Sequence, residues 1–503
     1  MTSYSSSFCL TSLSLSLSLC SLMGSMEKET DEPLTPAGRL FLRPEMNQVI
    51  NCAIGLKNPI DPESIKTEVL NSVMLKHPRF CSLMIRDSNG REHWRRTHID
   101  LDDHLIIHHN PIKEGDLLDE KDHESAVNHF LADMSTSSGL SYDKPLWEIH
   151  LLLAHNCLVF RIHHALGDGV SLMSMLLACC RRIDGEEALP RIPSFENKKG
   201  NSSSSGCSGS WWKLYLYYLS ALWGFVKMGL LSLIFVVEFV LRALWVRDRE
   251  TVISGGEGVE LWPRKLATAR FSIQDMKVVK KAVPNATIND VLFGVISSGL
   301  SRYLDHRGSN ALQQGLRITG VAMVNLRGQA GLQDLSTLMK DNSVSPWGNK
   351  FGMILLPVYY HTSGADPDPL QYLKRAKVMI DRKKHSVESH FSYKIGYLVM
   401  TYLGSMVAGL LNYRIVCNTS FTISNVVGPQ EEIAVGDNPV TYMRVNSSSL
   451  PHALTMHMLS YVGRADMQIL VAKDIIPDPE FLAKCFEEAL LEMKEAAQAT
   501  NKS

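Results

Sequence analysis

The sequence predicts an α/β protein made of two layered domains, joined by a polar linker and a long hydrophobic segment. Predicted strands and helices alternate over residues 26–196 and again over 255–495, which is typical of layered α/β folds. At 503 residues the chain is too long for one ordinary core. Hydrophobic residues make up 45% and charged residues 20%, so most of the chain should be globular.

The first half begins with apolar runs and helix signals in alternation. One predicted helix begins with Pro62 at its first position and ends before the pair His77-Pro78. Two apolar runs flank Ala154-His155-Asn156, which predicts a hairpin. The predicted elements are a strand at 48–54, a helix from 62 to about 76, strands at 146–153 and 157–162, and an apolar helix at 171–180.

The second half repeats this alternation. Thr287 is a suitable N-cap for the helix that follows it, and a cationic end completes an amphipathic helix up to Lys384. The stretch 397–411 is apolar and predicts a core or membrane-facing helix. The other predicted elements are helices at 288–304, 368–384 and from 479, and strands at 317–326, 353–360, 421–425, 456–462 and 468–472.

Three segments lie outside this pattern. Residues 1–25 alternate Ser and Leu without a basic start, so we expect a disordered leader or an over-called start before Met26, not a secretory signal. Residues 197–210 are mostly Lys, Asn, Ser and Gly and predict a flexible linker.

Residues 211–245 are dense in Leu, Val, Phe, Trp and Tyr, and aromatic residues gather toward the ends. Such a pattern suits a bilayer, but Lys227 and Glu238 leave only a short uncharged run. Three readings stay open: one transmembrane helix, a hairpin or interfacial helix, and a buried helix pair.

Composition excludes several classes of function. Lys and Arg total 51 against 52 Asp and Glu, which gives no reason to expect nucleic acid as a partner. The ten cysteines form no Cys-x-x-Cys pair, and the histidines show no ligand spacing, so no metal site is predicted. Apolar surroundings of several cysteines favour reduced thiols and a cytosol-facing body. No phosphate-binding Gly-rich loop or Gly-x-Ser-x-Gly elbow occurs.

The most informative stretch is His163-His164-Ala165-Leu166-Gly167-Asp168-Gly169, directly after a predicted strand. An imidazole exchanges protons near neutral pH, because its unperturbed pKa is about 6.5. Gly167 and Gly169 would allow a tight turn, with positive φ as one option. Without a nearby Ser or Cys nucleophile motif, the histidine is suited to general-base work: removing a proton from an alcohol or amine that attacks an acyl donor.

Several blocks together resemble the plant wax ester synthase/diacylglycerol acyltransferase family, in the chloramphenicol-acetyltransferase-like group of CoA-dependent acyltransferases. The resemblance spans about residues 32–494, and the Asp-Phe-Gly-Trp-Gly block of soluble BAHD acyltransferases is missing. The blocks are Glu32 to Pro36, Arg39 to Phe41, Pro145-Leu146-Trp147, His163 to Gly169, Thr287 to Val291, Asn325-Leu326-Arg327, Trp347-Gly348-Asn349, and Ser424 to Pro429.

The resemblance implies the chloramphenicol-acetyltransferase-like fold with a channel between its two domains. It also implies roles for the residues of the loop His163 to Gly169. His164 would be the general base, and His163 would support the loop by hydrogen bonding. Asp168 would hold the loop by pairing with an arginine, with Arg39 as one candidate.

Further roles concern the developing oxyanion, which needs a hydrogen-bond donor. Asn289, Asn425 and backbone N–H groups near Gly428 are candidates, although a turn or capping role suits each asparagine equally well. The block Pro145, Leu146 and Trp147 would more often pack beneath the acyl tunnel than take part in chemistry.

The resemblance implies an acyl-CoA-dependent O-acyltransferase. It would move a long-chain acyl group to a fatty alcohol or diacylglycerol, with acyl-CoA as co-substrate and no cofactor. We expect a membrane partner, at the endoplasmic reticulum with the catalytic domains facing the cytosol, or at the plasma membrane. The alternatives are an acyltransferase of specialised metabolites and a non-catalytic lipid-binding protein. Oligomeric state, chain length and the wax-to-triacylglycerol ratio stay open.

Overall fold

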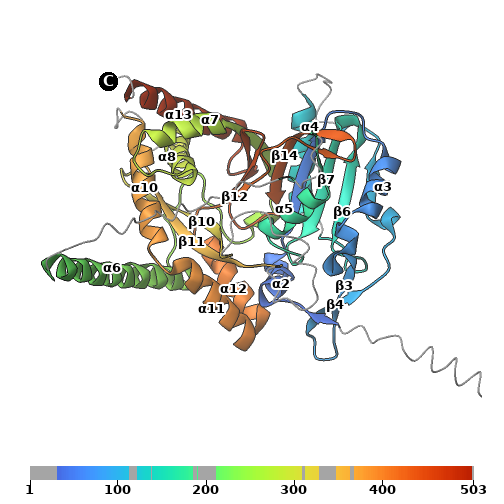
Figure 1. Ribbon diagram of the computed structural model, residues 1–503, viewed down its shortest axis with the longest axis horizontal. Coiled ribbons are helices and arrows are strands. Elements are labelled where there is room, and N and C mark those ends of the chain that lie inside the picture. Colours follow the sequence, from blue (N-terminus) through green and yellow to red (C-terminus); the bar gives the residue numbers. More distant parts are fainter. Residues whose placement is uncertain are drawn as a thin grey trace, which may run out of the picture.

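The computed structural model describes residues 31–112, 122–137, 139–184, 190, 211–308, 312–327, 347–362 and 368–500. The predicted leader at 1–25 and the linker at 197–210 lie outside the described residues. Two large sheets, each with helices on its outer side, face each other in the middle of the molecule (Figure 1).

The first sheet has seven strands in the order β5-β6-β7-β2-β14-β13-β8. The predicted hairpin is present, because β6 and β7 pair antiparallel. Its strands are β2 (Val49–Leu56), β5 (Leu105–His108), β6 (Trp147–Leu152), β7 (Cys157–His163), β8 (Arg181–Arg182), β13 (Ile433–Val435) and β14 (Asn438–Ser447). The nearby helices are α2 (Pro36–Phe41), α3 (Pro62–Asn71), α4 (Asp122–Thr136) and α5 (Gly169–Ala178).

Two strands of the first sheet come from the second half of the chain. β14 pairs antiparallel with β2, and β13 pairs with β8. The first sheet is therefore not built from residues 26–196 alone. A small separate sheet is formed by β1 (Glu32–Pro33), β4 (Glu92–Arg96) and β3 (Ser82–Arg86).

The second sheet has six strands in the order β11-β10-β12-β15-β16-β9. Its strands are β9 (Arg264–Ser272), β10 (Arg317–Asn325), β11 (Phe351–Tyr359), β12 (Phe421–Val427), β15 (Leu454–Tyr461) and β16 (Arg464–Ala472). The helices of this half are α7 (Ile273–Lys281), α8 (Ile288–Arg307), α10 (Leu370–Lys384), α11 (Glu388–Tyr402), α12 (Gly404–Cys417) and α13 (Pro479–Thr500).

Local sequence explains where several helices begin and end. Asp61 caps α3 by accepting from the N–H groups of Glu63 and Ser64. Thr287 and Asp290 form a reciprocal capping box at the start of α8, as Thr287 predicted. The helix predicted to reach residue 76 is shorter: α3 ends at Asn71, and a 3₁₀ turn covers Met74–Lys76.

Two apolar segments differ from simple expectations. The stretch 397–411 is divided between α11 and α12, because Gly404 adopts a φ of +83°, a left-handed geometry that suits glycine. Residues Trp211–Leu244 form the single continuous helix α6, so the hairpin and helix-pair readings are wrong. The first part of α6 projects away from the body (Figure 1).

The docked end of α6 is held by apolar contacts and by one buried cation. Phe239 and Ala243 pack in a small core with residues of β10, β11 and α12. Arg242, with its side chain 4% exposed, pairs with Asp248 at 2.7 Å. The last turns of this hydrophobic helix therefore belong to the globular body.

Candidate active site

His164 follows β7 directly and is held at the junction of the two halves of the molecule. The last residue of β7, His163, pairs with Val49 of β2. The His164 backbone N–H donates to the Gln48 carbonyl oxygen at 2.8 Å. The imidazole is half-buried.

Asn349, which precedes β11, binds His164 in two places. Its Nδ2 donates to the His164 carbonyl oxygen at 2.9 Å, and its Oδ1 lies 3.0 Å from the ring atom Nδ1. Since the amide nitrogen is used on the carbonyl, Oδ1 must accept, and Nδ1 must carry the proton. The other ring atom, Nε2, is therefore the unprotonated one that can accept a proton from a substrate.

Aromatic rings fix the plane of the imidazole. Phe41 of α2 stacks on His164 with ring centroids 4.1 Å apart, and Phe351 approaches edge-on at 6.0 Å. Burial lowers the pKa of His164, partly offset by the nearby Asp168 carboxylate. The neutral form required of a general base is therefore favoured at neutral pH.

His163 is a structural member of the loop. Its Nδ1 accepts from the Ala165 N–H at 3.1 Å, and its Nε2 lies 2.9 Å from Asn47 Oδ1. Both ring nitrogens are thus engaged in the loop support that the sequence predicted. Burial lowers the pKa of His163 to about 3, so this ring is neutral.

Asp168 is the N-cap of α5 and the centre of a buried ion pair. Its Oδ1 accepts from the Ser171 N–H at 3.1 Å, and its Oδ2 accepts from Arg327 Nη1 at 2.5 Å. The side chains of Arg327 and Asp168 are 3% and 8% exposed. The arginine partner is therefore Arg327, and the prediction of Arg39 is wrong, because Arg39 pairs with Glu92 at 3.5 Å.

The two glycines serve close packing instead of an unusual turn. Neither Gly167 nor Gly169 has a positive φ, which corrects that option. A Cβ on Gly167 would lie 3.2 Å from the Cβ of Ser171, and one on Gly169 would lie 3.4 Å from Val426 of β12. Glycine at these positions lets the loop lie close to α5 and to the second sheet.

The short segment from Trp347 to Lys350 clamps the whole loop. Trp347 Nε1 donates to the Leu166 carbonyl oxygen at 2.8 Å, and the Lys350 N–H donates to Asp168 at 3.0 Å. Arg327 also contacts the Gly348 carbonyl oxygen. Because this segment and Arg327 come from the second half, the two halves must be assembled before the histidine is in place.

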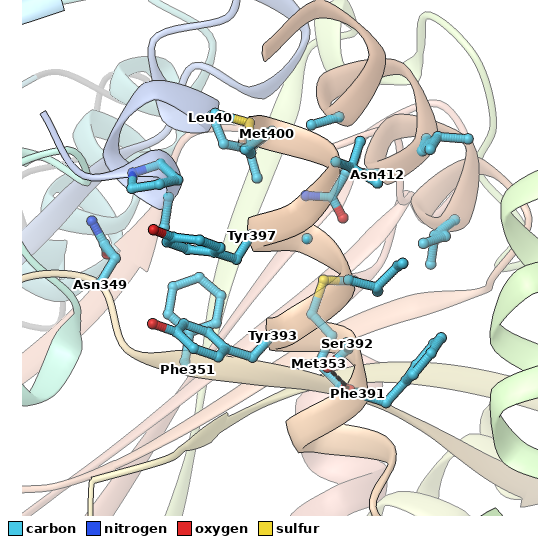
Figure 2. A pocket seen from close by; sticks show the side chains of 18 of the residues that line it. Leu40, Asn349, Phe351, Met353, Phe391, Ser392, Tyr393, Tyr397, Met400 and Asn412 are labelled. Atoms are coloured by element: carbon cyan, nitrogen blue, oxygen red, sulfur yellow. Dashed lines mark hydrogen bonds between the residues drawn. The ribbon is translucent and has the colours of Figure 1, made fainter. Parts of the chain in front are cut away.

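An apolar cavity of about 570 Å³ lies next to two neighbours of the histidine, although His164 itself is not among its lining residues. Asn349 and Phe351, both in contact with His164, form part of its wall, and α2, α11, α12 and the docked end of α6 form the rest. Figure 2 shows the hydroxyl groups of Tyr393 and Tyr397 pointing toward the side that holds Asn349. The opposite wall carries thioether and phenyl groups, including Met353 and Phe391. The cavity is thus polar on the Asn349 side and apolar beyond it.

Comparison with known proteins matches both halves of this arrangement. The wax ester synthase/diacylglycerol acyltransferase catalytic domain matches residues 129–292, and the WS/DGAT C-terminal domain matches residues 347–494. Wax ester synthase/diacylglycerol acyltransferase 5 of Arabidopsis thaliana is 35% identical, covering 94% of this chain and 95% of the relative. This chain belongs to the wax ester synthase/diacylglycerol acyltransferase family. It is an acyltransferase, as the motifs predicted.

Other relatives agree with this family. Wax ester synthase/diacylglycerol acyltransferase 6 of Arabidopsis thaliana is 34% identical over 94% of this chain and 95% of its own length. The solved wax ester synthase/diacylglycerol acyltransferase from Marinobacter aquaeolei VT8 has a TM-score of 0.55 at 16% identity, covering 93% of this chain and all (100%) of that one.

A trichothecene 15-O-acetyltransferase from Fusarium sporotrichioides has the same TM-score of 0.55 at 13% identity, covering 93% of this chain and 95% of that chain. The structural likenesses concern the fold, and they confirm the predicted two-domain α/β class.

The asparagines suggested for the family's oxyanion site bind each other. Asn425 Nδ2 donates to Asn289 Oδ1 at 2.8 Å, which links β12 to the start of α8. Alternation along β12 puts Asn425 on the same face as Ile423, whose side chain is in the core beneath the helices. The Gly428 N–H is engaged as well, because it donates to Ser460 Oγ at 3.2 Å. An oxyanion role for the pair stays a prediction.

The Pro145-Leu146-Trp147 block lies in the core of the first domain. Leu146 and Trp147 are fully buried, and the indole Nε1 donates to the Phe80 carbonyl oxygen at 2.9 Å. The Leu146 carbonyl oxygen accepts from the His163 N–H at 3.0 Å. In this family member the block therefore supports the histidine loop from beneath through backbone and packing contacts.

The sequence placed Arg327 and Asn349 only within family blocks, and it did not single out His457. His457 lies on β15 opposite Ser424 of β12, and its pKa is lowered to about 4 by burial and by the nearby His164. Its Nδ1 has no hydrogen-bond partner within the described chain. In the sequence, the one feature that could have pointed to His457 was its place within an apolar predicted strand.

The surface between the two sheets carries further unpaired polar atoms. A buried polar atom without a partner is costly, so a group that enters this space would gain by pairing with it. Within the described residues such atoms occur on Asn51, Asn446, Thr455 and Gln468, besides His457. They line the interface of β2 and β14 with β15 and β16.

Proposed function

We propose that this enzyme transfers a long-chain acyl group from acyl-CoA to a fatty alcohol, to diacylglycerol, or to both. The observation that carries the proposal is the tautomer of His164, fixed by Asn349, whose side chain also forms part of the wall of an apolar cavity. A base placed there acts on a hydroxyl group whose hydrocarbon part is held in the cavity. No cofactor besides the acyl-CoA co-substrate is needed for this chemistry.

The reaction follows from the position of one lone pair. His164 Nε2 removes the proton from the acceptor hydroxyl as its oxygen attacks the thioester carbonyl carbon. The resulting tetrahedral intermediate collapses, the carbon–sulfur bond breaks, and the imidazolium returns the proton to the leaving CoA thiolate. The new ester bond and free CoA complete the balance. Asp168 holds the loop through its pair with Arg327.

We place the CoA arm along the junction of the two sheets, where His457 is partly exposed. Its pantetheine portion carries amide groups, which need polar partners there. His457 lies in the same space beside the thioester position that His164 defines. The apolar cavity then remains for hydrocarbon, which separates the polar and apolar parts of the substrates.

The membrane partner is argued from helix α6. Tyr215–Leu244 is long and apolar enough to cross a bilayer, and 11% of its most apolar window is buried. A single crossing, however, would place Trp211 on the far side, while β8 and β9 flank the segment within one body. Residues 191–210 would have to cross back, and their Lys, Asn, Ser and Gly composition does not suit hydrocarbon.

We therefore propose that α6 lies in the plane of the membrane surface. Ser220, Gly224 and Lys227 recur at intervals of four and three residues, so they form one less apolar stripe along the helix. The tip of the α11–α12 hairpin exposes Tyr402, Leu403 and Met406 by 78%, 61% and 68%. Other residues of α6 and of this hairpin form walls of the cavity, so lipid substrates would enter it from the bilayer. The proposed location is the cytosolic face of the endoplasmic reticulum, with the plasma membrane as the alternative.

The test is ester formation in microsomes that contain the full-length protein. Labelled palmitoyl-CoA is supplied with hexadecanol, with diacylglycerol, or with a short polar alcohol, and the products are separated by chromatography. The proposal predicts wax ester, triacylglycerol or both, and little product from the polar alcohol. Preference for the polar alcohol would favour a specialised-metabolite enzyme. Absence of every ester would favour a lipid-binding protein, and either result would contradict the proposal.

A further inference from the structure

Acyl transfer places a developing negative charge on the thioester carbonyl oxygen, which needs a hydrogen-bond donor. The donors suggested by the sequence are engaged elsewhere. Asn289 and Asn425 bind each other at the helix-covered face of the second sheet. The Gly428 N–H is engaged with Ser460. The reaction therefore calls for a donor on the opposite face of this sheet, the face turned toward the first sheet.

His457 of β15 lies on that face, close to the loop that carries His164. Val426 of β12 marks the face, because a Cβ on Gly169 of the loop would lie 3.4 Å from the Val426 side chain. Val426 pairs with Leu459 of β15, and Leu459 packs in the core of the first domain. Side chains two residues apart on a strand share a face, so His457 lies on the same face as Leu459, about 7 Å along the strand.

The ring of His457 is neutral, and its two nitrogen atoms differ in accessibility. Burial, and to a smaller extent the nearby His164, lowers the pKa of His457 to about 4, so the ring is uncharged at neutral pH. The residue as a whole is half-buried, whereas its Nδ1 is buried without a hydrogen-bond partner in the described part of the chain. The accessible part of the ring is thus the distal end, which carries Nε2.

The tautomer of His457 follows from this burial. A buried N–H without an acceptor is rarer than a buried acceptor without a donor, so Nδ1 is the nitrogen without the proton. The single ring proton of the neutral imidazole then resides on Nε2. His457 and His164 therefore have opposite tautomers: Nε2 of His164 offers a lone pair, and Nε2 of His457 offers an N–H group.

We propose that His457 is a second catalytic residue, whose Nε2–H donates a hydrogen bond to the thioester carbonyl oxygen as that oxygen becomes an oxyanion. The inference rests on the acyl transfer proposed above. His164 acts on the acceptor hydroxyl from the first sheet, and His457 acts on the thioester oxygen from the second. A neutral imidazole can polarise a carbonyl group in this way. The His457 proton stays on Nε2 throughout, so the proton moved by His164 still ends on the CoA thiolate.

The experiment is steady-state ester formation by microsomes that contain the full-length protein, with palmitoyl-CoA and the acceptor that the wild type uses. His457→Phe keeps a flat ring without the N–H, and it should lower kcat about 100-fold or more with little change in the KM for palmitoyl-CoA. His457→Gln keeps an N–H donor and should recover part of this loss. The matched control, His93→Phe, removes a half-buried histidine from β4 of the small sheet and should keep the wild-type kcat.

The pH profile and the unfolding transition complete the test. Because His164 remains the base, the residual activity of His457→Phe should fall in acid as the wild-type activity does, and its unfolding transition should match that of the wild type. Loss of this acidic limb would make His457 a second base, and an equal loss of kcat in His457→Gln with a shifted transition would make it a structural residue. Either result would overturn the inference.

Two kinetic outcomes would also overturn it. An unchanged kcat in His457→Phe would mean that the ring does not act on the transition state. A raised KM for palmitoyl-CoA with an unchanged kcat would mean a CoA contact only. These outcomes refute the role of His457 alone, because the wild type still forms ester, whereas a wild type that forms no ester refutes the proposed function itself.

Discussion

Asn349 joins the two halves of the molecule at His164, with its amide bound both to the ring and to the backbone of the histidine. Asn349→Ala should lower kcat roughly tenfold to hundredfold, because the imidazole loses its fixed orientation, while KM changes little. Steady-state ester formation measures both values. Asn412→Ala, which truncates another asparagine of the same cavity, is the matched control. Equal kcat in the two variants would contradict the role of Asn349.

Arg327 should be the main residue from outside the loop His163 to Gly169 that stabilises this loop. Arg327→Ala leaves the buried Asp168 carboxylate without its cation, which should lower the free energy of unfolding by about 3–5 kcal/mol. Arg39→Ala is the control, since its pair with Glu92 is partly exposed and should cost less than about 1 kcal/mol. Denaturant unfolding in detergent measures both. A larger loss for Arg39→Ala would refute this assignment.

Stability should fall in acid because buried histidines stay neutral in the folded protein. The pKa values of His163 and His452 are lowered to about 3, whereas unfolded histidine titrates near 6.5. Below that pH the unfolded state binds more protons, so each residue should lower the free energy of unfolding by about 1.4 kcal/mol per pH unit down to its folded pKa. His163→Asn removes one of these titrating groups, so the plot of the free energy of unfolding against pH should have a slope smaller by one bound proton. Unfolding midpoints that are equal at neutral pH and at pH about 5 would contradict this linkage.

Cavity depth should set the acyl preference. Gly396 of α11 lines the cavity, and a Cβ there would meet no atom within 4 Å. Gly396→Leu should therefore fold and shift the preference toward shorter hydrocarbon chains by filling part of the space. Competition between acyl-CoA esters of different lengths measures the shift. Leu398→Phe adds bulk to the same helix outside the cavity lining and should leave the preference unchanged; an equal shift in this control would count against the cavity as the chain site.

Local patterns predicted most of the elements, because each depends on neighbours in the sequence. The β6–β7 hairpin, the start of α8 and the loop after β7 follow from apolar runs, a Thr N-cap and turn residues. Such patterns do not encode partners that are distant along the chain. Asp168 pairs with Arg327, 159 residues away, and the prediction that Arg39 is its partner is wrong.

The same limit applies to the sheets and to the hydrophobic helix. β14 joins the first sheet from almost four hundred residues beyond β2, and composition does not reveal that crossover. The sequence also left open whether residues 211–245 form one helix or two, and the structure shows one continuous helix over Trp211–Leu244. The apolar cavity likewise depends on three regions that are far apart in sequence: α2, α6 and the consecutive helices α11 and α12.

The central claim is that His164 is the base of the acyl-transfer step. The most direct measurement is the rate of ester formation by His164→Ala, compared with His109→Ala, which removes an exposed histidine. The account predicts a loss of at least about 100-fold for His164→Ala, with an unchanged unfolding transition, and no loss for the control. Ester formation by His164→Ala at the wild-type rate would contradict it.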